Sequence, residues 1–449
     1  MTTVIATCSL SLASPLPAES ESDRRPVLVR NAGLILTMDP QLGTGPLGII
    51  EGGDVLFDRT GILAVGKDLQ AQDAEVLDAT NRIVMPGFVN LHDHLFQTGI
   101  RGCGSDKDVN GWLTQCVRPL ERLNLSEEEV YALVRLSTLG VISTGITTTV
   151  DWSSAFTPQF VRGDIRALAD SGLRFVFAYR GTRSSIEDIR RVKRELIDPN
   201  PLARLQVGSH LFNQLDVNAM TQLARELGVM LHVHLLENIS QRQEGQITAL
   251  QTAGAFGPSL LVAHAIHLTD EEVGILAAND VRVAHNPLSN MRLASGVIRF
   301  PELRGGGIKV GLGLDGGTND TADMFNDMRV AVGLQRATTL SASAYPTIGD
   351  VLRLATMGGA EALDMADQIG SLTPGKRADL IVIDPSGINF AARFDWVSQI
   401  VLNGQPANVE WVFIDGQARK ANGRLVGVNA EKLVESAEVV TARIRAGLQ

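Results

Sequence analysis

The spacing of apolar and polar residues divides the chain into three zones. From about residue 26 to 83, short alternating runs separated by glycine turns are typical of half-buried antiparallel strands. From 85 to about 367, short continuous apolar runs alternate with amphipathic stretches, which is the pattern of βα units around a parallel sheet. After Gly370 short β-type runs return, and Ala430–Leu448 has the periodicity of an amphipathic helix.

The middle zone carries eight predicted strands and at least five helices between them. The strands are Ile83–Leu91, Thr147–Asp151, Arg174–Tyr179, Arg204–His210, Val229–His234, Leu260–His264, Arg282–His285 and Lys309–Leu314. The helices are Ser126–Thr144, Ile186–Leu196, Asn218–Leu227, Asp270–Asn279 and Thr347–Leu363. This order predicts an α/β fold, a closed (β/α)8 TIM-type barrel. A doubly wound open sheet is the alternative, but the glycine-rich turn expected after its first strand is missing.

The two ends of the chain resemble each other and differ from the middle. Strands are predicted at Val27–Met38, Gly48–Phe57, Gly61–Val65, Ala378–Ile383, Val397–Leu402 and Val409–Ile414, with a hairpin turn at Asp415-Gly416. We therefore expect one small β-sandwich domain built from both termini, covering 26–84 plus 371–449 and including the C-terminal helix. The barrel would then cover 85–370. Residues 1–25, rich in Ser, Ala, Thr and Pro, are expected to form a disordered tail.

Composition excludes several classes of protein. With 44% hydrophobic and 20% charged residues the chain can bury a large core, which excludes disorder of the whole chain. The net charge of −10 and the absence of basic runs argue against nucleic acid or a membrane surface as partner. No apolar run is long enough to span a bilayer. Three cysteines without a CxxC pattern predict no disulfide framework, which favours the reducing cytoplasm.

Histidine is the residue whose distribution is unusual. All eight histidines lie between His92 and His285. His92 and His94 follow the first predicted barrel strand, and their i, i+2 spacing places both imidazoles on one face. The ends of later strands add the following residues: His210, His232, His234, His264, His285 and Asp315. Because the carboxyl ends of barrel strands share one mouth, these side chains should meet there. Imidazole and carboxylate ligands without cysteine suit Zn²⁺ or Fe²⁺.

Several ordered motifs carry a family resemblance. The segment Met85-Pro86-Gly87-Phe88-Val89-Asn90-Leu91-His92-Asp93-His94 resembles the PGFxNxHxH opening of the amidohydrolase superfamily, in its cytosine deaminase-like and triazine hydrolase-like (ATZ/TRZ) branch. The supporting motifs are His234-Leu235-Leu236-Glu237, Val262-Ala263-His264, His285-Asn286-Pro287-Leu288-Ser289-Asn290, Gly311-Leu312-Gly313-Leu314-Asp315-Gly316 and Gly370–Val382. The likeness covers nearly everything after residue 26.

The resemblance implies a ligand set and catalytic roles. His92, His94, His234 and Asp315 match the family's ligands to one divalent metal, with zinc favoured and iron as the alternative. Asp315 would also take a proton from the metal-bound water. Glu237 and His264 match the residues that protonate a ring nitrogen and stabilise the developing charge. The end of the fourth strand lacks the lysine that bridges two metals in other members, which supports one metal per chain.

Substrate contacts are expected from four further residues. Gln97 follows the first motif at the spacing where related deaminases bind a ring amide or carbonyl. Trp112 is predicted either to stack on a flat heterocycle or to pack beneath its loop. His210 occupies a position where the family places a substrate-facing histidine, although Leu211 and Phe212 replace the usual Pro and aromatic residue after it. Asn319, just past Asp315, could reach the ligand.

The function implied is hydrolytic deamination of an aromatic nitrogen heterocycle: a pyrimidine, a purine or an s-triazine amine. Metal-activated water would attack a ring amidine carbon and ammonia would leave. The alternatives are a dechlorinase or alkylaminohydrolase of an s-triazine, and a cyclic amide or imidazolone hydrolase. A catalytically inactive scaffold would need a missing ligand, and none is missing. The family resemblance also implies a homodimer or higher homo-oligomer.

Overall fold

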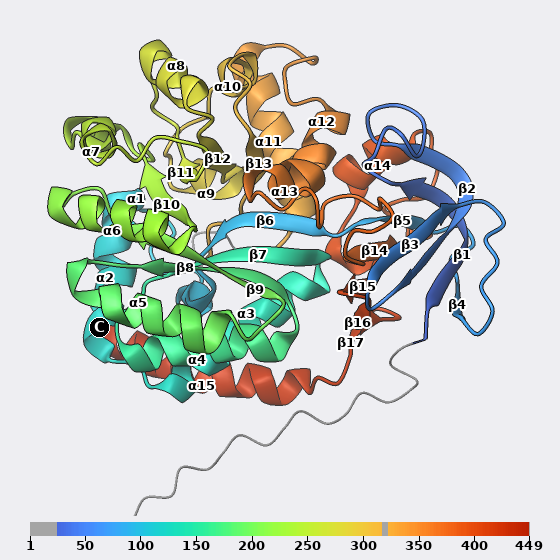
Figure 1. Cartoon of the computed structure of the whole chain (residues 1–449), viewed down its shortest axis with the longest axis horizontal. Coiled ribbons are helices and arrows are strands. Elements are labelled where there is room, and N and C mark those ends of the chain that lie inside the picture. The colour runs from blue at the N-terminus through green and yellow to red at the C-terminus, as the bar shows by residue number, and fades with distance from the viewer. Residues whose placement is uncertain (1–24, 317–321, 449) are drawn as a thin grey trace, which may run out of the picture.

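The computed structural model describes residues 25–316 and 322–448. The expected disordered tail, apart from Arg25, and the candidate substrate residue Asn319 lie outside the described residues. Figure 1 shows a barrel surrounded by helices, with a β sheet built from both ends of the chain beside it.

Eight parallel strands form the nearly closed barrel that the sequence predicted, in the order β6 to β13 around the sheet. They are β6 (Phe88–Asp93), β7 (Ile146–Ser153), β8 (Arg174–Arg180), β9 (Ala203–Ser209), β10 (Met230–Leu235), β11 (Leu260–His264), β12 (Arg282–His285) and β13 (Val310–Leu312). The backbone N–H groups of Leu314 and Asp315 donate to His92 O at 3.0 and 2.9 Å. The segment after the last strand is thereby joined to the end of the first.

The first predicted strand, Ile83–Leu91, is in fact two strands that belong to different sheets. β5 (Ile83–Pro86) pairs with strands of the terminal sheet, whereas β6 pairs with β7 of the barrel. Gly87 lies between them, so close to Thr147 that a Cβ at this position would come within 2.2 Å of the threonine side chain. Every residue of both strands is buried, so the apolar run shows no boundary in the sequence.

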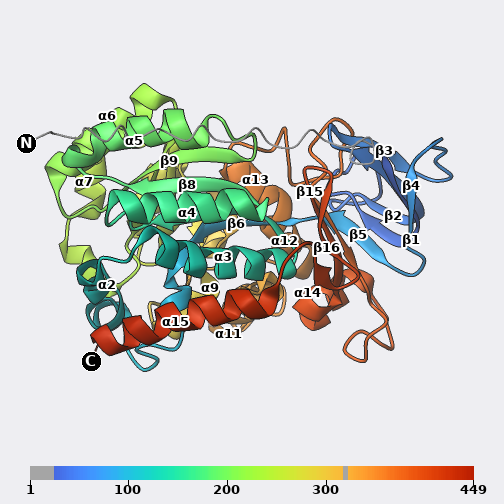
Figure 2. The same ribbon diagram turned by 90° about the horizontal axis from the view of Figure 1, so that it is seen from below.

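Helices cover the outside of the barrel (Figures 1 and 2). Four predicted helices are present as α3 (Glu127–Ser143), α5 (Ile186–Val192), α6 (Gln214–Leu227) and α8 (Asp270–Ala278). The predicted helix Thr347–Leu363 consists of α12 (Ile348–Arg353), a π turn (Leu354–Gly358) and α13 (Gly359–Ala362). The pattern did not single out α1 (Val109–Trp112), α2 (Arg118–Leu123), α4 (Pro158–Ser171), α7 (Gln246–Thr252), α9 (Pro287–Arg292), α10 (Phe300–Gly305) or α11 (Met324–Thr339).

The two ends of the chain share one nine-stranded sheet. Its N-terminal strands are β1 (Val27–Leu36), β2 (Ile49–Asp58), β3 (Gly61–Gly66), β4 (Glu75–Asp78) and β5. Its C-terminal strands are β14 (Leu380–Ile383), β15 (Val409–Ile414), β16 (Gln417–Ala421) and β17 (Arg424–Leu425). The two halves join where β5 pairs with β14. Asp415 and Gly416 both have positive φ, as the hairpin turn predicted at this position requires.

One predicted strand was wrong. Residues Val397–Leu402 lie within a helix, α14 (Trp396–Asn403). Asp395 caps its start by accepting a hydrogen bond from the Ser398 backbone N–H at 2.9 Å, and Ile400 and Val401 are buried. The apolar run is too short for its period to distinguish a strand from one buried side of a helix.

The last helix, α15 (Ala430–Leu448), coincides with the predicted range. It runs along the barrel beside α3, as Figure 2 shows, and buries Ala437, Val440 and Ile444. At its far end Arg443 donates to the backbone carbonyl of Leu123, at the end of α2. The end of the chain therefore returns from the terminal sheet to the outside of the barrel.

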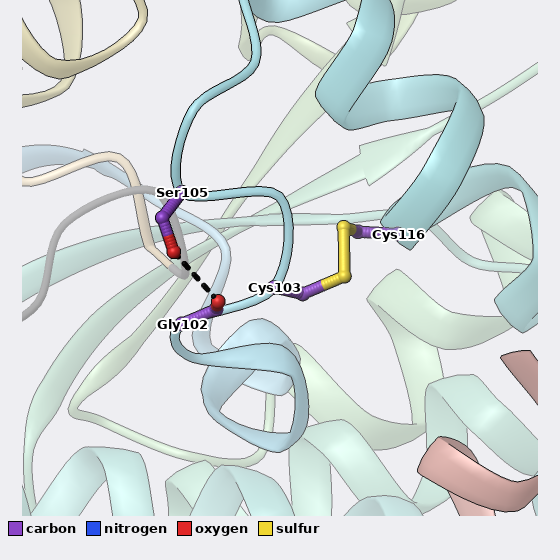
Figure 3. The surroundings of a disulfide bond; sticks show 4 residues. All are labelled: Gly102, Cys103, Ser105 and Cys116. Atoms are coloured by element: carbon purple, nitrogen blue, oxygen red, sulfur yellow. Dashed lines mark hydrogen bonds between the residues drawn. A yellow bond between two sulfur atoms is a disulfide. The ribbon is translucent and has the colours of Figure 1, made fainter.

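The expectation that the cysteines form no disulfide was also wrong. Cys103 and Cys116, thirteen residues apart, are bonded in the loop that follows β6 (Figure 3). The loop folds back through α1, which brings the two side chains together, and their spacing matches no common motif. Within the residues described, no helix is long and apolar enough to cross a membrane.

Candidate metal centre and active site

The histidines and Asp315 do converge at the carboxyl ends of the barrel strands. One potential ligand atom from each of His92, His234, His264 and Asp315 lies within 4.8 Å of the others. His94 adjoins this group, with its Nε2 3.3 Å from Asp315 Oδ1 and 3.2 Å from His234 Nε2. The four ligands expected from the sequence are therefore neighbours, together with His264.

The donor atoms of this cluster suit a divalent cation. The ring of His94 is oriented by its Nδ1–H, which donates to the Trp152 backbone carbonyl at 2.7 Å. This leaves the Nε2 lone pair facing Asp315, and His92 Nε2 lies 3.3 Å from the same carboxylate oxygen. Lone pairs and a carboxylate gathered in a buried site repel one another unless a cation lies among them. Nitrogen and oxygen donors without sulfur fit zinc or iron.

His264 differs from the other histidines in how its ring is held. The side-chain amides of Asn290 and Asn286 point their nitrogens at His264 Nδ1, at 2.9 and 3.2 Å. Nδ1 therefore accepts, and the ring proton lies on Nε2. Burial lowers the pKa of His264 to about 3, so the imidazole is neutral. Its Nε2 lies 3.9 Å from carboxylate oxygens of Glu237 and Asp315, too far for a hydrogen bond to either, so this N–H can donate to a ligand bound between them.

The pKa values of the two carboxyl groups of the site are shifted in opposite directions. Burial, together with the charge of Asp315, raises the pKa of Glu237 well above its usual range, which favours its protonated form. Burial acts against ionisation of Asp315 as well, but when the neighbouring rings are protonated, the charge of His264 and hydrogen bonds from His92 and His94 outweigh it and hold the pKa of Asp315 well below its usual value. Ser289 Oγ also donates to Asp315 Oδ2 at 2.5 Å. An acid and a base thus lie side by side.

The backbone is strained where these side chains emerge. His264 and Asp315 both have φ in the left-handed region, at 72° and 60°. Gly316, with φ of 64°, lies so close to the first motif that a Cβ would come within 2.8 Å of His94 O and 3.0 Å of Gln97 Oε1. Such conformations persist only where the surrounding structure enforces them, and they cluster at functional sites.

The candidate substrate residues lie in different surroundings, two of them near the histidine cluster and one in the hydrophobic core. Gln97, in the 3-10 turn Leu95–Ile100, is buried next to Gly316 at the mouth. His210 follows β9 and lies 5.3 Å from the Trp152 ring; burial, and then the charge of Arg180, lowers its pKa to about 3. Trp112 is buried in the hydrophobic core beneath its loop and does not join the histidine cluster.

The sequence reasoning missed Trp152, at the end of β7. Its ring contacts those of His94, His210 and His234 at centroid distances of 5.4, 5.3 and 4.7 Å. The polar stretch Asp151-Trp152-Ser153-Ser154, which ends a buried strand at the barrel mouth, was the available signal.

Arg180, at the end of β8, was also missed. Its guanidinium lies over the Phe156 ring at 5.5 Å, and its buried Nε has no hydrogen-bond partner among the residues described. Burial lowers the pKa of Arg180, and the nearest opposing charge is that of Glu121. A half-buried cation with no ion pair among the described residues, at the carboxyl end of a barrel strand, is placed to contact a bound ligand.

A nearly closed barrel with histidines and one aspartate converging at its carboxyl end defines a metal-dependent enzyme of the barrel type. A profile described as the amidohydrolase family matches residues 83–419. The chain belongs to the amidohydrolase family.

Individual relatives cover almost the whole chain. It is 30% identical over 438 residues to a 5'-deoxyadenosine deaminase of Methanosarcina acetivorans, which covers 93% of this chain and 98% of the relative. It is 31% identical to a 5-methylthioadenosine/S-adenosylhomocysteine deaminase of Syntrophomonas wolfei, over 89% and 96% of the two chains. The crystal structure of an adenosine deaminase from Xanthomonas campestris with bound zinc superposes with a TM-score of 0.85 at 25% identity, covering 94% and 98%.

Proposed function

We propose that this protein is a metal-dependent hydrolase that deaminates a nitrogen heterocycle and releases ammonia. The observation that carries the proposal is the placement of two carboxyl groups beside the histidine cluster: Glu237 and Asp315 each lie 3.9 Å from His264 Nε2, and the pKa of the first is raised while that of the second is lowered. Deamination of a cyclic amidine needs both groups: a base to activate water and an acid to protonate the ring nitrogen.

The metal would be held by His92, His94, His234 and Asp315. One ion per chain is proposed, zinc in the first instance and iron as the alternative, and the zinc in a related structure supports this choice. When bound, such an ion lowers the pKa of water toward about 7 and so supplies a nucleophile at neutral pH.

The protein's own groups would divide the proton transfers. Asp315 accepts a proton from the attacking water, and His264 Nε2–H donates a hydrogen bond to the oxygen that attacks the ring carbon. Glu237 delivers its proton to the adjacent ring nitrogen. The exocyclic amine then takes up the proton held by Asp315 and leaves as ammonia, while the hydroxyl on the ring carbon returns its proton to Glu237 and becomes the product carbonyl. The buried positions of all three side chains exclude bulk water from these transfers.

We propose adenine nucleosides as the substrate class. The names of the relatives above all refer to compounds with a 6-aminopurine ring. This ring is a cyclic amidine with an exocyclic amine, which matches the acid and base in the site. Gln97, His210, Trp152 and Arg180 at the mouth would contact the ring and its sugar, Asn319 would add a further contact, and Trp112 would support the loop.

An ammonia-release assay on the zinc-loaded protein tests the proposal. The panel comprises adenosine, 5'-deoxyadenosine, 5-methylthioadenosine, S-adenosylhomocysteine, cytosine and an s-triazine amine. We expect ammonia from the adenine nucleosides. Release from cytosine or the triazine alone would overturn the substrate class. Silence across the panel from metal-loaded protein would overturn deamination, and chloride, alkylamine and ring-opened products of triazines and cyclic amides would then be measured.

The division into domains stays a proposal: 26–84 plus 371–449 as a β-sandwich domain with a C-terminal helix, and 85–370 as the barrel. Phe57 of β2 and Phe413 of β15 support it, because their ring centroids lie 4.9 Å apart. Three strands separate β2 from β15 in the sheet, so a flat sheet would hold them about 19 Å apart. The sheet therefore folds back on itself, as the two layers of a sandwich do.

A homodimer or higher homo-oligomer in the cytoplasm is also proposed, on the family resemblance and the scarcity of cysteine. Light scattering tests the first part. Thiol alkylation of the denatured protein in fresh cell extract, with and without prior reduction, tests the second: labelling of Cys103 and Cys116 without reductant is expected in a reducing compartment, and persistence of their disulfide would contradict it.

A further inference from the structure

Three buried side chains form a continuous line from the amino end of the barrel to the proposed metal site. Gln206 on β9 accepts from the His232 ring, with 2.9 Å between its Oε1 and Nδ1. His232 Nε2 lies 3.1 Å from Nδ1 of His92. Each of the three is at most 2% exposed, so water does not compete for these bonds.

The chemistry of Gln206 sets the direction of every hydrogen bond in this line. Its carbonyl oxygen can only accept, so His232 Nδ1 carries the ring proton and donates it. In a neutral His232 the lone pair is then on Nε2, which accepts from His92 Nδ1–H. The lone pair of His92 is left on Nε2, which lies 3.3 Å from Asp315 Oδ1.

The position of Gln206 itself is also fixed. Its amide nitrogen lies 3.6 Å from the sulfur of Met230, a weak acceptor, which is consistent with the carbonyl oxygen facing His232. The neighbouring backbone is held by Trp152, whose indole N–H donates to His232 O at 3.3 Å. The Gln206 side chain and the backbone of His232 are therefore both held in place.

The other proposed histidine ligands are held in different ways. His94 donates to a backbone carbonyl, and His234 Nδ1 has no hydrogen-bond partner among the described residues. His92 is the ligand oriented by a side chain from the opposite end of the barrel. Gln206 lines a cavity of about 300 Å³ at that amino end, with Val176, Ala203, Arg204 and Met230, so a substrate at the mouth does not reach it.

We propose that Gln206 is a positioning residue which, acting through His232, holds His92 in the tautomer that presents Nε2 to the metal. The inference rests on the proposed metal site and goes beyond it. Partners of this kind commonly change metal affinity by about 10- to 100-fold. Removing the acceptor should therefore loosen the metal without touching a ligand or the substrate pocket.

The test compares two variants of the zinc-loaded protein. Gln206→Met keeps the length of the side chain and removes the carbonyl acceptor, whereas Gln206→Glu keeps an acceptor in the same place. We expect the rate of zinc loss to a chromogenic chelator to rise about 10- to 100-fold in Gln206→Met and to stay within about threefold of the parent in Gln206→Glu. The melting temperature of the metal-free forms is measured in parallel.

Gln335→Leu is the matched control. Gln335 is also buried and donates to Ile298 O at 2.7 Å, on the outer helix α11. This variant should melt earlier while retaining zinc as the parent does. Equal zinc retention in Gln206→Met and the parent overturns the positioning role, and so does equal loss from the Met and Glu variants. A parent protein that binds no zinc contradicts the proposed function instead.

Discussion

Individual side chains at the site owe their chemistry to burial. Glu237 and Asp315 are both carboxylic acids in one buried site, yet the pKa of the first is raised and that of the second is lowered, and the aspartate lies 3.3 Å from His92 and His94. The two side chains carry the same chemical group, so the difference between their pKa values comes from their positions relative to the histidines. Their roles are therefore separable by single substitutions.

Replacing Glu237 with Gln should abolish turnover while zinc remains bound. The amide keeps the size of the side chain but has no proton of suitable acidity, so we expect kcat to fall by about 10²- to 10⁴-fold. Ammonia release and zinc content are measured on the same sample. Glu244→Gln, on the exposed turn nearby, is the control and should leave both unchanged. Full activity in the Glu237 variant would rule out its role as the proton donor.

Asp164→Asn should make stability less dependent on pH. Burial raises the pKa of Asp164 to about 6, from an ordinary value near 3.8. The folded state then binds more protons than the unfolded state between these values, so the free energy of unfolding falls as pH rises from about 4 to 6. Asparagine cannot ionise, and the variant should gain about 3 kcal/mol relative to the parent by pH 7.

The measurement for Asp164 is urea unfolding at a series of pH values from 4.5 to 8. Asn at this position can still accept from Ser153 Oγ, the 2.7 Å bond that the aspartate makes. Asp170→Asn, exposed on the same helix, should follow the parent curve. Parallel curves for the parent and Asp164→Asn would contradict the burial of an ionisable carboxyl group.

At the scale of elements, the barrel and the terminal sheet are joined by a buried ion pair. Arg174, the first residue of β8, contacts both oxygens of Asp379 at 2.6 and 3.0 Å, and Asp415 at 3.0 Å. Asp379 precedes β14, and Asp415 follows β15. Asp379, which lies within the Gly370–Val382 motif, thus joins the two sheets through Arg174.

Arg174→Met should destabilise the protein by about 3–5 kcal/mol, because Asp379 would be left buried without a counter-charge. Chemical unfolding followed by circular dichroism measures the loss. Lys309→Met removes a cation from a partly exposed pair with Asp280 and should cost less than about 1 kcal/mol. Similar losses in the two variants would show that the buried pair has no special role in joining the sheets.

At the scale of the whole molecule, the metal site connects distant parts of the chain. The proposed ligands come from β6, β10 and the segment after β13, and Asp315 also closes the barrel through its backbone bond to His92. An ion bound there stabilises the folded state and not the unfolded state, because the ligands are far apart when the chain is unfolded.

Chelation should therefore lower the melting temperature. At a free zinc concentration of 1,000 times Kd, binding adds about 4 kcal/mol to the free energy of unfolding. Scanning calorimetry with a chelator, and again after zinc is restored, measures the change. Asp315→Asn should melt at a temperature that barely responds to chelator. If the melting temperature of the parent protein is also unchanged by chelator, no metal is bound at this site.

The sequence by itself determined the barrel, the shared terminal sheet and the residues that end the strands with imidazole or carboxylate groups. These follow from local periodicity and from the rule that parallel strands point their carboxyl ends the same way. Only the tertiary structure decided that α14 is a helix, that Cys103 meets Cys116, and that Gln206 reaches His92 through His232. Such features depend on contacts between residues far apart in sequence, or on burial that a short apolar run does not reveal.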